Sequence, residues 1–182
     1  MELIIAIILM SLIILSLTSI YLFSRFHVFT SDRLTKAQNE ASFVLDHMTK
    51  NICQAIGSAV PFDLRIAVEI DPLNNNRIRV RLDSNSNGEA DANDQWISYR
   101  WFPAPQNTVR YYQPYFPAGW PVGAGEVISA NITNWTTAVI GNSVGVTVTA
   151  CSTPNDPYPC GNANNPNVNM STSIQMPAVS AN

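Results

Sequence analysis

Positive charge and helix-breaking residues are missing from long stretches of this 182-residue sequence. No Lys or Arg follows Arg110, and the 72 residues after it contain only two acidic residues. Because a nucleic-acid footprint or a lipid-binding patch needs clustered positive charge, we expect no nucleic-acid partner. Gly and Pro are both absent before Gly57, so nothing in the sequence obliges a helix that begins at Met1 to end before about Ile56.

Groups that carry enzyme chemistry are scarce too. The two histidines, His27 and His47, both fall on the predicted helix, and neither has an obvious nucleophile or carboxylate partner in the sequence. No phosphate-binding glycine loop and no zinc-ligand spacing occurs. We therefore expect no enzyme and no catalytic residues, and we interpret both histidines as structural or exposed.

The first half of the predicted helix is strongly apolar. Leu3 to Phe23 is a run of 21 residues without charge, Gly or Pro, which is long enough to cross a bilayer core of about 30 Å as a helix. We expect residues 1–27 to form a transmembrane or filament-core helix. A cleaved signal peptide explains the run poorly, because it lacks a basic start and a small-residue cleavage site. A simple membrane anchor is the alternative.

Residues 28–57 are predicted to continue the helix with an amphipathic pattern. Apolar residues recur every three or four positions at Leu34, Ala37, Ala41, Leu45, Met48, Ile52 and Ile56. Charged residues take the other faces at Asp32, Arg33, Lys36, Glu40, Asp46 and Lys50. One stripe is therefore expected to pack on a domain while the remaining faces point outward.

Residues 58–182 read as a β-rich globular domain, in which apolar and polar residues alternate. The predicted strands are 64–70, 77–82, 95–102, 108–113, 126–132, 144–151 and 168–175. The expected fold class is α+β, with the long helix packed on an antiparallel sheet. Between Phe102 and Gly125, five prolines and several aromatic residues predict an ordered surface loop. Four roles are open for the aromatic rings of this loop: they cover the sheet, contact another subunit, bind a receptor or carry electrons.

The segment from Asp83 to Asp94 has the spacing of a calcium loop. Oxygen side chains stand at loop positions 1, 3, 5, 9 and 12, and Gly88 stands at position 6. The predicted ligands, which include the backbone carbonyl of Glu89 at position 7, are Asp83, Asn85, Asn87, Glu89, Asp91 and Asp94. Strands are predicted on both sides, so Ca2+ would be structural rather than sensory. A hairpin loop with solvated acids is the alternative, and Mg2+ fits less well because the ligand set is large.

Three cysteines occur in the chain. Cys151 and Cys160 enclose eight residues whose prolines and Asn-Asp pair favour a turn that brings the two thiols together. A disulfide there would indicate an oxidising compartment outside the cytoplasm. Two free cysteines in a loop are the alternative, and a zinc site is less favoured because no histidine lies nearby. Cys53 is left unpaired and is expected on a packed helix face.

Glu2 places a carboxylate at the start of the apolar run, where an isolated charge in hydrocarbon is unfavourable. The segment Met1-Glu2-Leu3-Ile4-Ile5-Ala6-Ile7 resembles the part of type IV prepilins that follows their processing site. The resemblance implies a short basic leader that prepilin peptidase removes, after which Glu2 meets the N-terminal amine of a neighbouring subunit and sets its register. The alternative is an ordinary acid near a helix N-terminus, where the helix dipole favours it.

The resemblance also implies a function. The chain would be a structural subunit of an extracellular pilus-like filament, held in the inner membrane before assembly machinery polymerises it with identical or homologous subunits. Residues 127–134, 144–149 and 170–176 loosely resemble the end of minor pilins and J-type pseudopilins, so major pilin, minor pilin and secretion pseudopilin are all open. A membrane-anchored surface adhesin with a calcium-stabilised domain is the competing interpretation.

Overall fold

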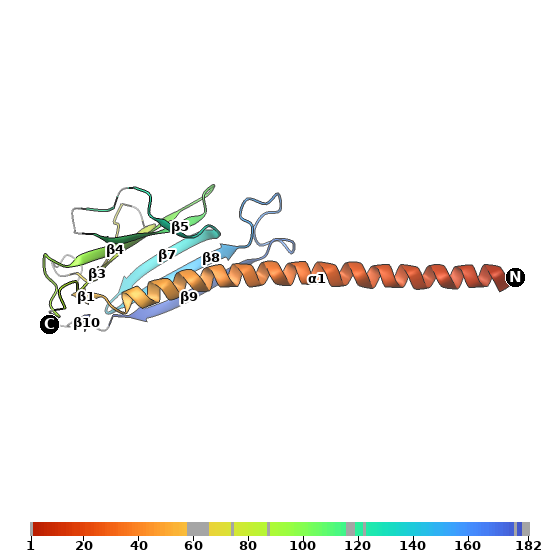
Figure 1. The fold of residues 1–182 in the computed structure, drawn as a ribbon, viewed down its shortest axis with the longest axis horizontal. Helices are drawn as coiled ribbons and strands as arrows, with labels where there is room; N and C mark the ends of the chain where they lie inside the picture. The colour runs from red at the N-terminus through yellow and green to blue at the C-terminus, as the bar shows by residue number, and fades with distance from the viewer. Residues whose placement is uncertain are drawn as a thin grey trace.

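A computed structural model of the protein describes residues 2–57, 66–73, 75–86, 88–115, 119–121, 123–176 and 178–179. These residues form one long helix, α1 (Glu2–Ile52), followed by strands (Figure 1). The strands are β1 (Ile56–Gly57), β2 (Val68–Ile70), β3 (Arg77–Leu82), β4 (Gln95–Phe102), β5 (Thr108–Tyr115), β6 (Glu126–Ser129), β7 (Ile132–Ile140), β8 (Ser143–Cys151), β9 (Asn167–Gln175) and β10 (Ala178–Val179). The predicted α+β architecture is confirmed.

The helix runs without a break from the protruding tip into the domain (Figure 1). Inside its apolar half, the hydroxyls of Ser16, Thr18 and Ser19 donate to carbonyl oxygens three or four residues earlier, at 2.8–2.9 Å. Such bonds satisfy the hydroxyls within the helix itself, so no partner is needed to bury them. The apolar and amphipathic parts are therefore two halves of one continuous rod.

The buried stripe of the helix begins at Ala37 and continues through Ala41, Leu45, Met48 and Ile52 as predicted. Leu34 was predicted to belong to it but is 38% exposed. Val44, in contrast, is fully buried and was not predicted. It lies three residues after Ala41, so it shares the face that packs on β8 and β9.

The helix ends at Ile52, four residues earlier than predicted. The amides of Gln54 and Ala55 bond to carbonyls only three residues back, which tightens the last turn. Ala55 then bridges to Leu82, and β1 pairs in parallel with β10. Because the chain leaves the helix here, Cys53 is exposed, and the prediction that it lies on a packed helix face is wrong.

Strands β2 to β6 form a five-stranded antiparallel sheet in sequence order, and β7, β8 and β9 form a second antiparallel sheet. The predicted strand 126–132 is two strands: β6 ends at Ser129 and β7 begins at Ile132. The predicted strand 64–70 is described only from residue 66 and begins at Val68. One hydrophobic core joins α1 to the inner faces of both sheets.

The proline-rich segment after Phe102 is not all loop. It contains β5, which confirms the strand predicted from Thr108 and extends it through Pro114. The pairing of β4 with β5 shifts register between Trp96 and Ser98, and this irregularity leaves room for a residue that has no amide hydrogen to donate. Residues 116–118 and 122 lie outside the described residues.

Candidate functional site

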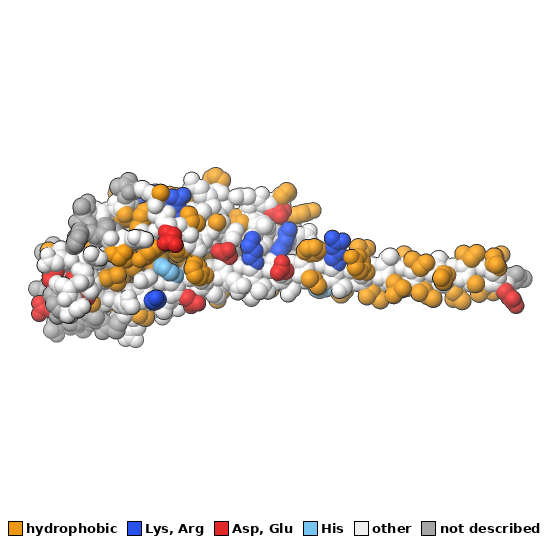
Figure 2. Space-filling model, viewed as in Figure 1, with side chains coloured by type: hydrophobic (Ala, Val, Ile, Leu, Met, Phe, Trp, Pro, Cys, Tyr) orange, Lys and Arg blue, Asp and Glu red, His pale blue; other side chains and the backbone are white. Residues whose placement is uncertain are grey.

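The first part of α1 is an apolar surface that the rest of the domain leaves uncovered. Its large apolar side chains from Leu3 to Phe29 are 46–75% exposed. Figure 2 shows apolar side chains along this protruding half and an acidic side chain near its tip. Soluble monomers rarely expose a continuous apolar surface of this extent. By length and composition this helix could span a membrane.

The disulfide between Cys151 and Cys160 is present, as predicted, with a Cα–Cα distance of 5.9 Å. Residues 151–165, called here the disulfide region, contact the helix just beyond its exposed apolar half. Arg33 pairs with Asp156 at 3.5 Å and donates a hydrogen bond to the carbonyl oxygen of Asn164. The disulfide region therefore holds the protruding helix at a fixed place on the domain.

A second link between helix and domain comes from Glu40, which was predicted to face outward. Its carboxylate accepts hydrogen bonds from the Ser129 hydroxyl at 2.7 Å and from the Asn131 side-chain amide at 3.0 Å. Both partners lie where the chain leaves the five-stranded sheet for β7. Partners 89 and 91 residues away give no local signal, so sequence reasoning missed this contact.

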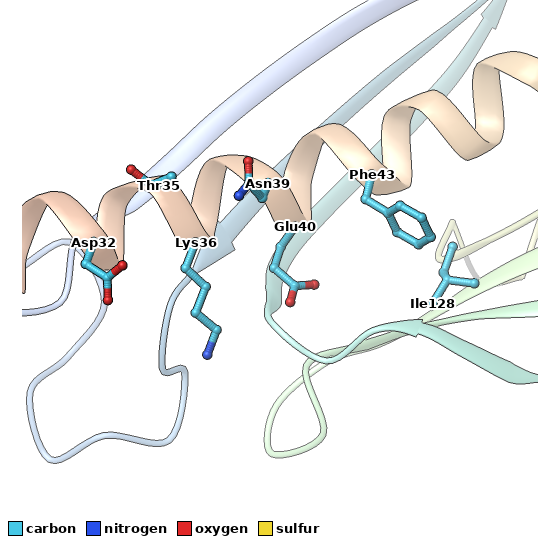
Figure 3. A pocket seen from close by; sticks show the side chains of 7 residues that line it. All are labelled: Asp32, Thr35, Lys36, Asn39, Glu40, Phe43 and Ile128. Atoms are coloured by element: carbon cyan, nitrogen blue, oxygen red, sulfur yellow. The ribbon is translucent and has the colours of Figure 1, made fainter.

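An open groove runs along α1 beside Glu40. It has a volume of about 430 Å3 and lies between one face of the helix and Ile128 of β6 (Figure 3). Its lining mixes charged, amide and apolar side chains: Asp32, Thr35, Lys36, Asn39, Glu40, Phe43 and Ile128. Such a mixed surface is typical of non-obligate protein contacts.

The predicted calcium loop joins β3 to β4 as a hairpin, because Leu82 pairs with Gln95. Gly88 has a φ of 75°, the left-handed conformation that the sharp bend at position 6 requires. Asp91 is central, since its carboxylate accepts hydrogen bonds from the Asn85 side chain at 3.1 Å and the Asn93 amide at 2.7 Å.

The remaining predicted ligands occupy different environments. Asp83 accepts a hydrogen bond from the Gly88 amide at 2.9 Å, whereas Glu89 is exposed and Asn87 lies outside the described residues. Asp94 is fully buried; one oxygen accepts from the Asp91 amide at 2.7 Å, and the other has no hydrogen-bond partner in the described structure. Across the part of the chain that the structure describes, no three His, Cys, Asp or Glu side chains are grouped to hold a metal.

His47 lies in a polar and aromatic cluster between α1 and the five-stranded sheet. Its Nδ1 is 2.9 Å from the Tyr99 hydroxyl, which also accepts a hydrogen bond from Asn51 at 2.6 Å. The Tyr111 ring lies 5.0 Å from the His47 ring. Burial lowers the pKa of His47, with nearby Glu126 opposing that shift, and burial raises the pKa of Tyr99.

The lowered pKa of His47 predicts how stability depends on pH. The folded protein favours the neutral imidazole of His47. The contribution of His47 to the stability of the fold is therefore fully present above the unfolded pKa of about 6.5, and it is lost as the pH falls toward the lower pKa of the folded state. We expect His47→Gln to reduce the loss of melting temperature between pH 7 and pH 5. His27→Gln, at an exposed position of the same helix, is the matched control. If the melting temperature of His47→Gln depended on pH as that of the wild type does, this role of His47 would be contradicted.

Comparisons with known proteins assign this chain to no family. No protein-family model matches it, and neither a curated protein nor a solved structure gives a significant match.

Proposed function

We propose that the protein is a structural subunit of a type IV pilus-like filament, assembled through the apolar half of α1. The observation that carries this proposal is the continuous helix whose first half is exposed on all sides while its second half is fixed to a β-rich domain. A surface of this kind needs an apolar environment. Lipid supplies it before assembly, and equivalent helices of neighbouring subunits supply it in the filament.

Glu2 gives the assembly its register. A carboxylate at the start of an apolar bundle is strongly unfavourable unless it has a partner. The N-terminal amine of a neighbouring subunit is a partner of opposite charge, and it is reached only when the two helices are displaced correctly along the axis. If the subunits are identical, such head-to-tail contacts repeat without closing and generate a helical fibre.

The domain would form the outer layer of that filament, outside the cell. The disulfide supports this location, because disulfides persist in oxidising compartments. The ties from Arg33 and Glu40 to the domain support a rigid subunit, since a loosely attached domain would not repeat regularly along a fibre. A minor pilin or secretion pseudopilin would use the same helix, and both are alternatives within this proposal.

Electron microscopy of the purified full-length chain tests the proposal. After detergent is removed, we expect uniform fibres about 50 to 100 Å wide, from a core of helices about 10 Å across surrounded by compact domains. A membrane-anchored adhesin would instead give monomers or irregular aggregates. That outcome, with native chain extracted from its own membrane, would favour the adhesin.

We also propose that loop 83–94 binds structural Ca2+. Asp94 supports this, since a buried carboxylate oxygen without a partner is unfavourable and a bound cation would supply that partner. The hairpin flanks and the left-handed Gly88 give the loop the bend that alternate oxygen ligands require.

Calcium is therefore expected to raise the melting temperature of the full-length chain. A ligand at 100 times its dissociation constant stabilises a folded protein by about 2.7 kcal/mol, which is several degrees for a domain of this size. Asp91→Asn should remove the response to millimolar Ca2+, whereas Asp46→Asn, on an exposed helix face, should retain it. If millimolar Ca2+ left the melting temperature of the wild-type protein unchanged, the proposed calcium site would be ruled out.

A further inference from the structure

Half of the chain's ten basic residues are arginines of three adjacent strands, β3, β4 and β5. Ile78, Val80, Ile97, Tyr99 and Val109 of the same strands are fully buried in the core. Side chains alternate between the two faces of a strand, so the arginines share the opposite face, directed away from the core. Composition alone does not reveal this grouping.

Three of these arginines form a row across the sheet. Arg77 pairs in register with Arg100, and Arg100 pairs in register with Arg110. Like charges directly opposite each other in a sheet are destabilising. Of the three arginines in this row, only Arg77 has an acidic partner among the described residues, Asp71 at 3.8 Å. Arg100 and Arg110 therefore bring two positive charges together without a described counter-charge.

The same aromatic ring contacts both guanidinium groups. The guanidinium carbon of Arg100 lies 4.3 Å from the centre of the Phe102 ring, and that of Arg110 lies 5.0 Å from the same centre. Cation–π contacts of this kind orient the groups without neutralising their charge. The Nε atoms of Arg77, Arg100 and Arg110 are buried without a hydrogen-bond partner in the described structure.

We propose that Arg100 and Arg110 form a binding site for a divalent oxyanion, a sulfate or phosphate group. Both residues are only partly buried, so part of each stays exposed to solutes. Guanidinium groups bind such oxygens through paired hydrogen bonds. A group with two negative charges balances both arginines, whereas a single carboxylate balances one. The inference does not depend on filament assembly.

The test uses the full-length chain in non-ionic detergent, melted in sodium phosphate, sodium sulfate, sodium acetate or sodium chloride at equal ionic strength. We expect phosphate and sulfate to raise the melting temperature above the chloride value, and acetate to do so less. Arg100→Gln and Arg110→Gln should each weaken phosphate binding by about tenfold. Arg79→Gln is the matched control, because it removes the same charge from the same face but Arg79 is already paired with Glu69.

A second measurement does not depend on variants. In wild-type protein labelled with 15N-arginine, phosphate should shift the Nε–H signals of Arg100 and Arg110 and leave that of Arg25, on the helix, in place. Dextran sulfate distinguishes the source of the group: binding tighter than that of inorganic sulfate identifies a sulfated polymer, and equal binding identifies the free anion. The proposal would be overturned if the wild-type protein had the same melting temperature in all four salts. It would also be overturned if phosphate raised the melting temperature of Arg110→Gln as much as that of the wild type.

Discussion

Replacing Glu2 with Ala is expected to leave the protein in the membrane fraction while abolishing filaments. The apolar run from Leu3 onward is unchanged in this variant, so its insertion into lipid should be unchanged as well. In the proposed filament, however, the amine of each neighbouring subunit loses its counter-charge in an apolar core. Removing one member of a buried charge pair typically costs about 3–5 kcal/mol, and this recurs at every subunit.

Asp32→Asn is the matched control, because it removes the same charge from an exposed position on the same helix. We expect this variant to form normal fibres by negative-stain microscopy, at wild-type yield per unit of membrane protein. Glu2→Gln distinguishes charge from size, since it retains the side-chain length and should still fail to assemble. Abundant normal filaments from the Glu2→Ala variant would sink the register role and leave the apolar helix as a membrane anchor.

The long helix is the feature that local sequence specifies best. The absence of Gly and Pro permits it, and apolar residues spaced three or four apart indicate which face is buried. Its end is specified differently, since nothing between Ile52 and Ile56 breaks a helix. The chain leaves the helix there because Ala55 and β1 pair with residues far away in sequence. Pairing of that kind overrides local preference.

The strands, too, differ in how far the local sequence predicts them. The strand patterns of β3 and β4 predicted that the candidate calcium loop joins a hairpin, and the pairing of the two strands agrees. β7 was largely missed because its exposed positions carry Asn and Thr, so its sequence resembles a loop. Only the structure shows the buried Ile132 and Trp135 that identify it as a strand.

Contacts at the candidate sites depended most on long-range structure. Arg33 and Glu40 were predicted to face outward, yet each hydrogen-bonds residues more than 85 positions away. The row formed by Arg77, Arg100 and Arg110 likewise depends on the register of three strands. The cysteine pair was predictable because the eight residues between its members form a local turn.

Two features stabilise the disulfide region: one acts on the unfolded chain and the other on the folded protein. The bond between Cys151 and Cys160 closes a short loop, which restricts the unfolded chain. Asn165 acts in the folded state: it is fully buried and donates hydrogen bonds to the carbonyl oxygens of Thr153 and Tyr158, both at 2.9 Å. The loop it organises carries the Asp156 contact with the helix.

Converting both bridged cysteines, Cys151 and Cys160, to Ala is expected to lower the free energy of unfolding by about 2–4 kcal/mol, measured by denaturant titration in detergent. Cys53→Ala is the matched control and should change little, because Cys53 is exposed and unbonded. Asn165→Ala leaves buried polar groups without partners and should lower stability even when the disulfide is intact. The double variant could instead unfold at the same denaturant concentration as Cys53→Ala. The hydrogen bonds of Asn165, rather than the disulfide, would then stabilise this region. In that case a reductant would leave the contact between Arg33 and Asp156 unchanged.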